Sequence, residues 1–335
     1  KCKRIGSSKS ITRKNINKKK NFLLNIISND GGNTIEYFIK RINSRQKFNE
    51  FNNNLIELIK NAIIPMNEKG VYHFDLKSGN IVGKKNKNFQ VIDWGISFID
   101  HGLEDDEPLK LMNRRPIQFN IPYTNLLFHD NYQKAINTTA NSNFGDISKD
   151  DAIECAEYII GDYISKHGPG HIYYLRPICK NMFPEYSEIY LIKNFIALAI
   201  MEKQFYKQVD GKLEFDKVKY YKEVFKPNID IFGVVSSYYN FYDNEFKKKI
   251  PNYLYDDIVN NLHIYLKPLI FDFPKKKIDT NYLFNQLKKI NIATYNYSSS
   301  SKRSSKKSSS LRKKSKSVSK RKTRKNIIKK YNIWI

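Results

Sequence analysis

Three short apolar stretches lie close together between residues 71 and 93, and each begins, ends or is followed by a polar residue whose side chain could take part in catalysis or metal binding. The stretches are VYHF (71–74), NIVG (80–83) and FQVID (89–93). Short runs rich in Val, Ile, Phe and Tyr between polar turns predict β-strands. Asp75 directly follows the first stretch, Asn80 opens the second, and Asp93 closes the third. The pattern therefore places two carboxylates and one carboxamide at strand ends.

Charge is distributed unevenly along the chain of 335 residues. The formal net charge is +26, but residues 1–20 carry nine Lys or Arg and residues 301–335 carry fifteen, with no acidic residue in either segment. The remainder is almost neutral. A bare nucleic-acid-binding domain would show its basic excess across a folded face. We therefore expect a near-neutral folded domain between basic, disordered ends at 1–20 and 296–335.

Cysteine usage and hydropathy indicate in which cellular compartment the protein is found. Cys2, Cys155 and Cys179 form no CxxC pair, which favours a reducing, intracellular compartment, either cytoplasmic or nuclear. No run approaches the ~18 apolar residues of a membrane span, so we expect none. The opening KCKRIG has no Met and no apolar signal core, which predicts no secretion signal and is typical of a fragment.

Apolar residues at helical spacing predict that helices dominate the central part of the chain. Before them, NFLLNIIS (21–28) suits a buried strand that ends at the turn NDGG. A helix over 34–42 has the apolar face Ile35, Phe38, Ile39 and Ile42. A helix over 48–63 has the apolar face Phe51, Leu55, Leu58, Ile59 and Ala62. Further helices are expected at 150–166, 187–206, 228–242, 254–270 and 280–290, whereas the pattern over 98–150 is looser.

Asp75, Lys77, Asn80 and Asp93 together have the functional groups that phosphoryl transfer from ATP requires. That reaction needs a carboxylate for the attacking hydroxyl, oxygen ligands for Mg²⁺, and a cation near the transferred group. Asp75 suits the first role. Asn80 and Asp93 suit Mg²⁺, which takes hard oxygen ligands. Lys77 lies two residues after Asp75 and would point toward the same phosphoryl group, so ATP and Mg²⁺ are the expected cofactors.

These residues also resemble the signature motifs of the protein-kinase superfamily. HFDLKSGN (73–80) is similar to the catalytic loop H-R-D-L-K-x-x-N, and DWG (93–95) is similar to the metal-binding D-F-G. At roughly one in twenty per position, the five loop identities coincide by chance on the order of once in ten thousand such chains. The resemblance implies an α+β, protein-kinase-like fold over 21–295, mainly the helical C-terminal lobe, with a long insert at about 125–225.

The resemblance carries further expectations about activity and source. D-L-K-x-x-N accompanies serine/threonine kinases, so the implied reaction is γ-phosphoryl transfer from ATP to hydroxyls of a protein substrate. The segment LNIISNDGGNTIEYF is similar to the hinge between kinase lobes, where the backbone of Ser28, Asn29 and Asp30 would face adenine. Divergent motifs and a long insert are similar to those of kinases from large DNA viruses, which would place the protein in a host cell or a virion.

The same resemblance assigns structural roles to two residues. His73 would bond to backbone near the metal-binding aspartate rather than act as a base. NIDIFGVV (228–235) is similar to the family's D-x-W-S-x-G helix start, so Asp230 would be buried and bonded to the catalytic-loop backbone.

The chain also departs from the family pattern. Phe74 replaces an arginine that in the family often pairs with a phosphate on the activation segment, which implies that phosphorylation of that segment does not switch activity. Trp94 replaces the D-F-G phenylalanine. No glycine-rich phosphate loop, lysine strand or glutamate-bearing helix precedes the hinge. Either that lobe is missing from this sequence, or the chain cannot hold ATP in the usual way.

Two alternative functions remain open. One is a pseudokinase or scaffold that binds nucleic acid or another polyanion through the basic tail, which the lack of a nucleotide lobe favours. The other is a small-molecule phosphotransferase similar to aminoglycoside or choline kinases, in which IDWG and H-x-D-x-x-x-x-N are frequent. Lys77 and the motif around Asp230 favour the protein-kinase class over this second alternative.

Overall fold

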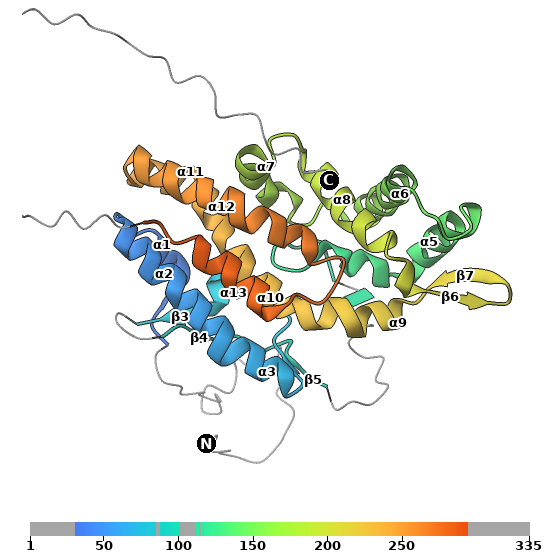
Figure 1. The fold of residues 1–335 in the computed structure, drawn as a ribbon, viewed down its shortest axis with the longest axis horizontal. Coiled ribbons are helices and arrows are strands. Elements are labelled where there is room, and N and C mark those ends of the chain that lie inside the picture. Colours follow the sequence, from blue (N-terminus) through green and yellow to red (C-terminus); the bar gives the residue numbers. More distant parts are fainter. Residues whose placement is uncertain (1–30, 85–87, 101–111, 114, 294–335) are drawn as a thin grey trace, which may run out of the picture. The chain divides into compact units, whose positions relative to one another are not determined.

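The computed structural model describes residues 31–84, 88–100, 112–113 and 115–293. Helices predominate in this part of the chain, and the strands are short and form three small antiparallel sheets (Figure 1). The α+β expectation is thus confirmed in its coarse form, a mixed and mostly helical fold. The expected strand at 21–28, the basic segment 1–20 and the tail 296–335 lie outside the described residues. Among the described helices, none is long and apolar enough to cross a membrane.

The three strands expected between residues 71 and 93 are present, but they do not all pair with one another. One sheet has the order β1-β3-β4, made of β1 (Asn33–Thr34), β3 (Ile81–Gly83) and β4 (Gln90–Val91). In its register Asn33 faces Gly83, and Ile81 faces Val91. A second sheet joins β2 (Val71–Tyr72) to β5 (Phe98–Ile99), a strand that the sequence did not predict.

The helical region between β1 and β2 follows the expected pattern until its last turns. It comprises α1 (Ile35–Ile39), α2 (Arg45–Leu58), a π-helical turn (Ile59–Ile63) and α3 (Ile64–Glu68). Of the predicted inward residues, Phe51, Leu55, Leu58 and Ile59 are buried. The prediction for Ala62 was wrong, because it is exposed and Ile63 is buried instead. A π turn inserts one extra residue, which rotates the following side chains away from the spacing of a regular α-helix.

Residues 125–225 contain several helices and one hairpin. The elements are η4 (Tyr123–Phe128), α5 (Asp130–Ser142), α6 (Lys149–His167), η5 (Ile172–Leu175), α7 (Arg176–Met182), α8 (Glu188–Ile200), η6 (Lys203–Phe205), β6 (Tyr206–Val209), β7 (Lys212–Phe215), α9 (Lys217–Tyr220) and η7 (Tyr221–Phe225). The helix expected at 150–166 is confirmed as α6. The helix expected at 187–206 ends earlier, at Ile200, and a short 3₁₀ turn and the β6–β7 hairpin follow.

Helix α5 was not predicted because its sequence is mostly polar. Only Tyr132, Ile136 and Ala140 are buried along it, one residue per turn. Its asparagines bond to the hairpin instead: Asn137 Oδ1 accepts from the Phe215 backbone N–H (3.0 Å), and Asn141 exchanges two hydrogen bonds with the backbone of Leu213. These amides satisfy strand groups at a sheet edge, a role that hydrophobic periodicity does not reveal.

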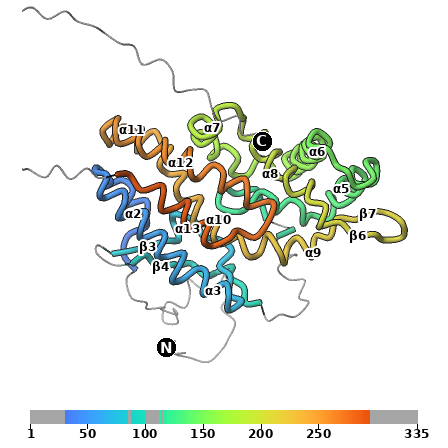
Figure 2. Tube along the Cα trace, viewed as in Figure 1, coloured from blue at the N-terminus to red at the C-terminus, as the bar shows by residue number. Residues whose placement is uncertain are grey.

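The remaining helices largely follow the sequence expectation, except that the helix expected at 228–242 continues as a 3₁₀ helix after Ser236 and that a short helix at 244–249 was not predicted. They are α10 (Lys226–Ser236), η8 (Ser237–Tyr242), α11 (Asn244–Lys249), α12 (Asn252–Asp272) and α13 (Thr280–Lys289). Helix α10 is buried on all sides from Asn228 to Ser236, so it forms the centre of the fold. Helix α13 lies beside α2, which brings the end of the described chain against its beginning (Figure 2).

One buried amide connects three of these elements. Asn52 of α2 is fully buried, and its Nδ2 donates to the backbone oxygen of Leu287 in α13 (2.8 Å). Its Oδ1 accepts a hydrogen bond from the hydroxyl of Tyr238 in η8. A buried polar group is tolerated only when its partners are present, so this network ties α2, α13 and η8 together.

We predict that Tyr238→Phe lowers the free energy of unfolding by about 1–3 kcal/mol, because Asn52 Oδ1 loses a buried donor. Urea denaturation measures the change. Tyr253→Phe is the matched control, since Tyr253 is 62% exposed and loses no buried contact. Equal effects of the two substitutions would contradict the role given to Asn52.

The histidine that precedes α5 is held in a neutral state. His129 is buried, stacks on Tyr132 and contacts the rings of Tyr163 and His167, and its Nε2 has no hydrogen-bond partner among the described residues. Burial lowers the pKa of His129 to about 4, and the charge of His167 adds to this effect. Between pH 4 and 6.5 the unfolded chain therefore binds more protons at this position than the folded protein does.

Because that proton binds the unfolded state more tightly, we predict that the contribution of His129 to stability falls as the pH falls below 6.5. The contribution of His129 is about 2 kcal/mol between pH 7 and pH 5. Unfolding free energies measured at several pH values should show a smaller slope for His129→Gln than for the wild type. Identical slopes would show that His129 titrates normally in the folded protein.

Candidate active site

The loop from His73 to Asn80 connects β2 to β3, and hydrogen bonds to Asp230 of α10 anchor it. The buried carboxylate of Asp230 accepts hydrogen bonds from the backbone N–H groups of His73 (2.8 Å) and Phe74 (2.9 Å). Burial raises the pKa of Asp230 to about 6, while these two donors and the Arg115 charge oppose the shift. The expectation that Asp230 is buried and bonded to this loop is confirmed.

Two backbone features explain how the loop can lie so close to α10. Phe74 has a φ of +64°, a conformation that a bulky residue adopts only when its surroundings hold it there. One turn after Asp230, Gly233 faces the loop, and a Cβ on it would lie 2.5 Å from the Leu76 backbone oxygen. Glycine is therefore required at 233, because any side chain would push the loop away.

His73 connects this loop to the residue before Asp93. Its Nε2 lies 3.0 Å from the Ile92 backbone oxygen, and its Nδ1 accepts from the Asp75 backbone N–H at 3.3 Å. Since the Ile92 oxygen can only accept, the proton of the neutral ring is on Nε2. The His73 ring also contacts Trp94, with 4.8 Å between ring centres. The bond expected between His73 and the backbone near Asp93 is confirmed.

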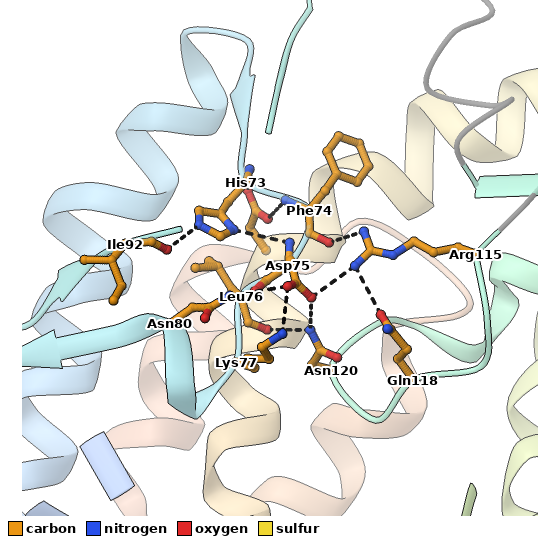
Figure 3. A network of polar contacts seen from close by, with 11 residues as sticks. His73, Phe74, Asp75, Leu76, Lys77, Asn80, Ile92, Arg115, Gln118 and Asn120 are labelled. Carbon is orange, nitrogen blue, oxygen red and sulfur yellow. Dashed lines mark hydrogen bonds and ion pairs between the residues drawn. The ribbon is translucent and has the colours of Figure 1, made fainter. Parts of the chain in front are cut away.

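The carboxylate of Asp75 is the centre of a polar network (Figure 3). Its Oδ1 accepts from Arg115 Nη2 (3.0 Å) and Asn120 Nδ2 (3.1 Å). Its Oδ2 accepts from Lys77 Nζ (2.8 Å) and Asn80 Nδ2 (3.3 Å). Burial alone would raise the pKa of Asp75, but hydrogen bonds from Lys77 and Asn120 and the charges of Lys77 and Arg115 outweigh it and lower that pKa. Asp75 is therefore ionised at neutral pH.

The structure brings Asn80 and Asp93 to neighbouring strand ends. The Asn80 backbone oxygen accepts from the Ile92 N–H (3.0 Å), and Asp93 follows directly with a φ of +66° and an exposed side chain. The Asn80 amide nitrogen is directed at Asp75, bonding its backbone oxygen (2.8 Å) as well as its carboxylate. The amide oxygen of Asn80 and the carboxylate of Asp93 are hard donors of the kind Mg²⁺ takes, so this pair fits the ion.

Among the described residues, no three or more His, Cys, Asp or Glu side chains gather in a way that could hold a metal ion. A magnesium site at Asn80 and Asp93 does not require such a group, because Mg²⁺ usually binds one or two protein ligands and keeps waters and phosphate oxygens. The nucleotide-contacting residues predicted from the hinge resemblance, Ser28, Asn29 and Asp30, lie outside the described residues.

Sequence reasoning missed Arg115 and Asn120, the two donors to Asp75 Oδ1. Both are almost fully buried, and Asn120 also donates to the Leu76 backbone oxygen (3.0 Å). The sequence contains no regular signal for them. In RPIQFNI (115–121), Arg115 and Ile117 are spaced for one face of an extended segment, but Asn120 and Ile121 are adjacent and both buried.

Comparison with protein-family models, curated proteins and solved structures finds no match to this chain.

We predict that Asp230→Asn destabilises the protein by about 2–3 kcal/mol at pH 7, because the amide can offer only one oxygen to two buried backbone donors. Asp243→Asn is the control, since Asp243 caps α11 at an exposed position where asparagine serves equally well. Urea denaturation of both variants gives the comparison. A loss at Asp230 no larger than that at Asp243 would show that the loop does not depend on this anchor.

Proposed function

We propose that this chain is a divergent serine/threonine protein-kinase-like phosphotransferase, which transfers the γ-phosphoryl group of ATP to protein hydroxyls. The observation that carries the proposal is the arrangement around Asp75. An ionised carboxylate contacts both Lys77 and Asn80, and Asp230 and His73 fix the loop that presents all three. Phosphoryl transfer depends mainly on positioning and charge, and the arrangement is suited to both.

Each side chain then has a distinct role. Asn80 and Asp93 would hold Mg²⁺, which when bound neutralises charge on the phosphates. Asp75 orients the attacking hydroxyl and accepts its proton as the hydroxyl oxygen bonds to the γ-phosphorus, while the bond from that phosphorus to the β–γ bridging oxygen breaks and ADP leaves. A carboxylate has about four acceptor positions, and protein donors fill all four at Asp75, so one donor must leave when the hydroxyl arrives. Lys77, with 35% of its side chain exposed, is the donor that can move toward the phosphoryl group.

An exposed apolar surface beside Asp93 supports the same proposal. Ile92, Trp94 and Ile96 are each about two-fifths exposed, at 40%, 44% and 39%. Contiguous exposed apolar side chains are typical of surfaces that another part of the molecule or a partner covers. In the proposed enzyme, a nucleotide-binding lobe would lie on this surface and enclose the phosphates.

We predict Mg²⁺-dependent transfer of phosphate from ATP to a protein substrate such as myelin basic protein or casein. Asp93→Ala should abolish transfer, and Asp75→Asn should lower kcat by about 10²–10⁴-fold. Asp210→Asn is the control, because Asp210 lies exposed in the β6–β7 turn, where asparagine tolerates the same positive φ. Removal of Mg²⁺ with EDTA should stop the reaction, and added Mg²⁺ should restore it.

The same assay separates the alternatives. Phosphate on an aminoglycoside or on choline, with none on protein, would replace the proposal with a small-molecule phosphotransferase. No nucleotide binding and no transfer, together with salt-sensitive nucleic-acid binding that is lost when residues 297–335 are deleted, would favour a scaffold instead.

A further inference from the structure

Residues 115–121, which we call the strap, hold one side of the Asp75 loop. Arg115 is 7% exposed, and its guanidinium donates to the Phe74 backbone oxygen (2.5 Å), to Asp75 Oδ1 (3.0 Å) and to Gln118 Oε1 (3.1 Å). Asn120 bonds Asp75 Oδ1 and the Leu76 backbone oxygen from the same strap. Figure 3 shows both side chains reaching Asp75 from the side opposite Asn80. The strap therefore fixes one carboxylate oxygen and two loop carbonyls.

The middle of the strap is held in turn by a tight turn in the long insert. This GPGH turn, residues 168–171, connects α6 to η5. The His171 backbone N–H donates to the Ile117 oxygen (3.1 Å). Gly170 has a φ of +55°, and a Cβ on it would lie 2.7 Å from that same oxygen and 3.5 Å from the Ile117 nitrogen. Ile117 lies between Arg115 and Asn120, so the turn contacts the strap midway between its two donors to Asp75.

These contacts need no phosphate. Phe74 occupies the position where the loop could have carried its own cation, and Arg115 of the strap places a guanidinium at the Phe74 carbonyl instead. Between Asp93 and Asn120 the sequence has a single hydroxyl side chain, Ser97, whose Oγ donates to the Trp94 backbone oxygen. Hydrogen bonds to neutral backbone groups and the buried Arg115–Asp75 ion pair thus order the strap. The planar guanidinium group of Arg115 fixes the geometry of that pair.

We propose that the GPGH turn positions the strap and, through Arg115 and Asn120, the Asp75 carboxylate, so that the insert assembles the site without phosphorylation of the segment after Asp93. This inference rests on the proposed phosphotransferase function. It makes Gly170, His171 and Arg115 positioning residues. A displacement of about 1 Å at a reacting group can lower the rate up to 10²-fold, so small changes at the turn should be measurable at Asp75.

The test compares Gly170→Ala with Gly211→Ala in the full chain. Both glycines have a positive φ, +55° and +77°, which strains an alanine, but Gly211 lies exposed in the β6–β7 turn and a Cβ there meets no atom within 4 Å. Gly170→Ala should lower kcat by about 10–100-fold with little change in the KM for ATP, whereas Gly211→Ala should stay within about 3-fold of the wild type. Thermal unfolding checks that both variants are folded.

Hydrogen exchange followed by mass spectrometry provides a readout that requires no activity. Gly170→Ala should speed deuterium uptake in peptides covering 115–121 and 73–80, and Gly211→Ala should leave both unchanged. If Gly170→Ala exchanges like Gly211→Ala, the positioning of the strap by the GPGH turn is overturned, whether or not the wild type transfers phosphate. If exchange rises while kcat stays at the wild-type value, the positioning role is overturned.

A second pair of variants tests the strap itself. Arg115→Met removes the positive charge, and Arg115→Lys keeps the charge but lacks the planar guanidinium group. We expect transfer to fall most for Met and to be partly restored for Lys, with both proteins still folded by thermal unfolding. If Arg115→Met transfers phosphate at the wild-type rate, the inference is overturned. A wild type that transfers no phosphate at all would instead contradict the proposed function, and the exchange comparison would still decide the role of the turn.

Discussion

The carboxylate of Asp230 is the interaction on which the candidate site depends. It lies wholly inside the protein, where a charge is costly unless hydrogen bonds compensate for its lost hydration. The backbone N–H groups of His73 and Phe74 provide that compensation. In doing so they fix two successive peptide groups and hold Phe74 at its positive φ. The chain from Asp75 to Asn80 therefore leaves α10 in one defined direction.

Two sets of contacts extend this anchor to segments that lie far from it in the sequence. The His73 ring ties the loop to Ile92, which sets the position of Asp93 just beyond the end of β4. Arg115 and Asn120 of the strap bond to the loop, and the Ile117 oxygen of the strap accepts a hydrogen bond from His171 in the long insert. The insert is thus part of the framework that holds Asp75. Its helices α6 and α8 pack against each other, and the GPGH turn that follows α6 contacts the strap.

The sequence predicts the parts of the site that depend on short-range spacing. His73, Asp75, Lys77 and Asn80 lie within one loop, so their proximity follows from the chain itself, and the role of Asp230 followed from a second motif. Arg115 and Asn120 could not be found in this way, because their positions depend on how the strap packs, and no local period encodes that packing. Ala62 was misplaced for a related reason, since a π turn interrupts the helical spacing that predicted it to be buried.

The two cations at Asp75 differ in a way that suits the proposed reaction. Arg115 is buried and makes three hydrogen bonds, so its removal from Asp75 would leave a guanidinium unpaired in the interior, at a cost of about 3–5 kcal/mol. Lys77 is partly solvated, and water can replace its contact with Asp75 at little cost. A substrate hydroxyl would therefore displace Lys77 and leave Arg115 in place. The fixed cation then keeps Asp75 ionised and aligned, while the mobile one becomes free to follow the phosphoryl group.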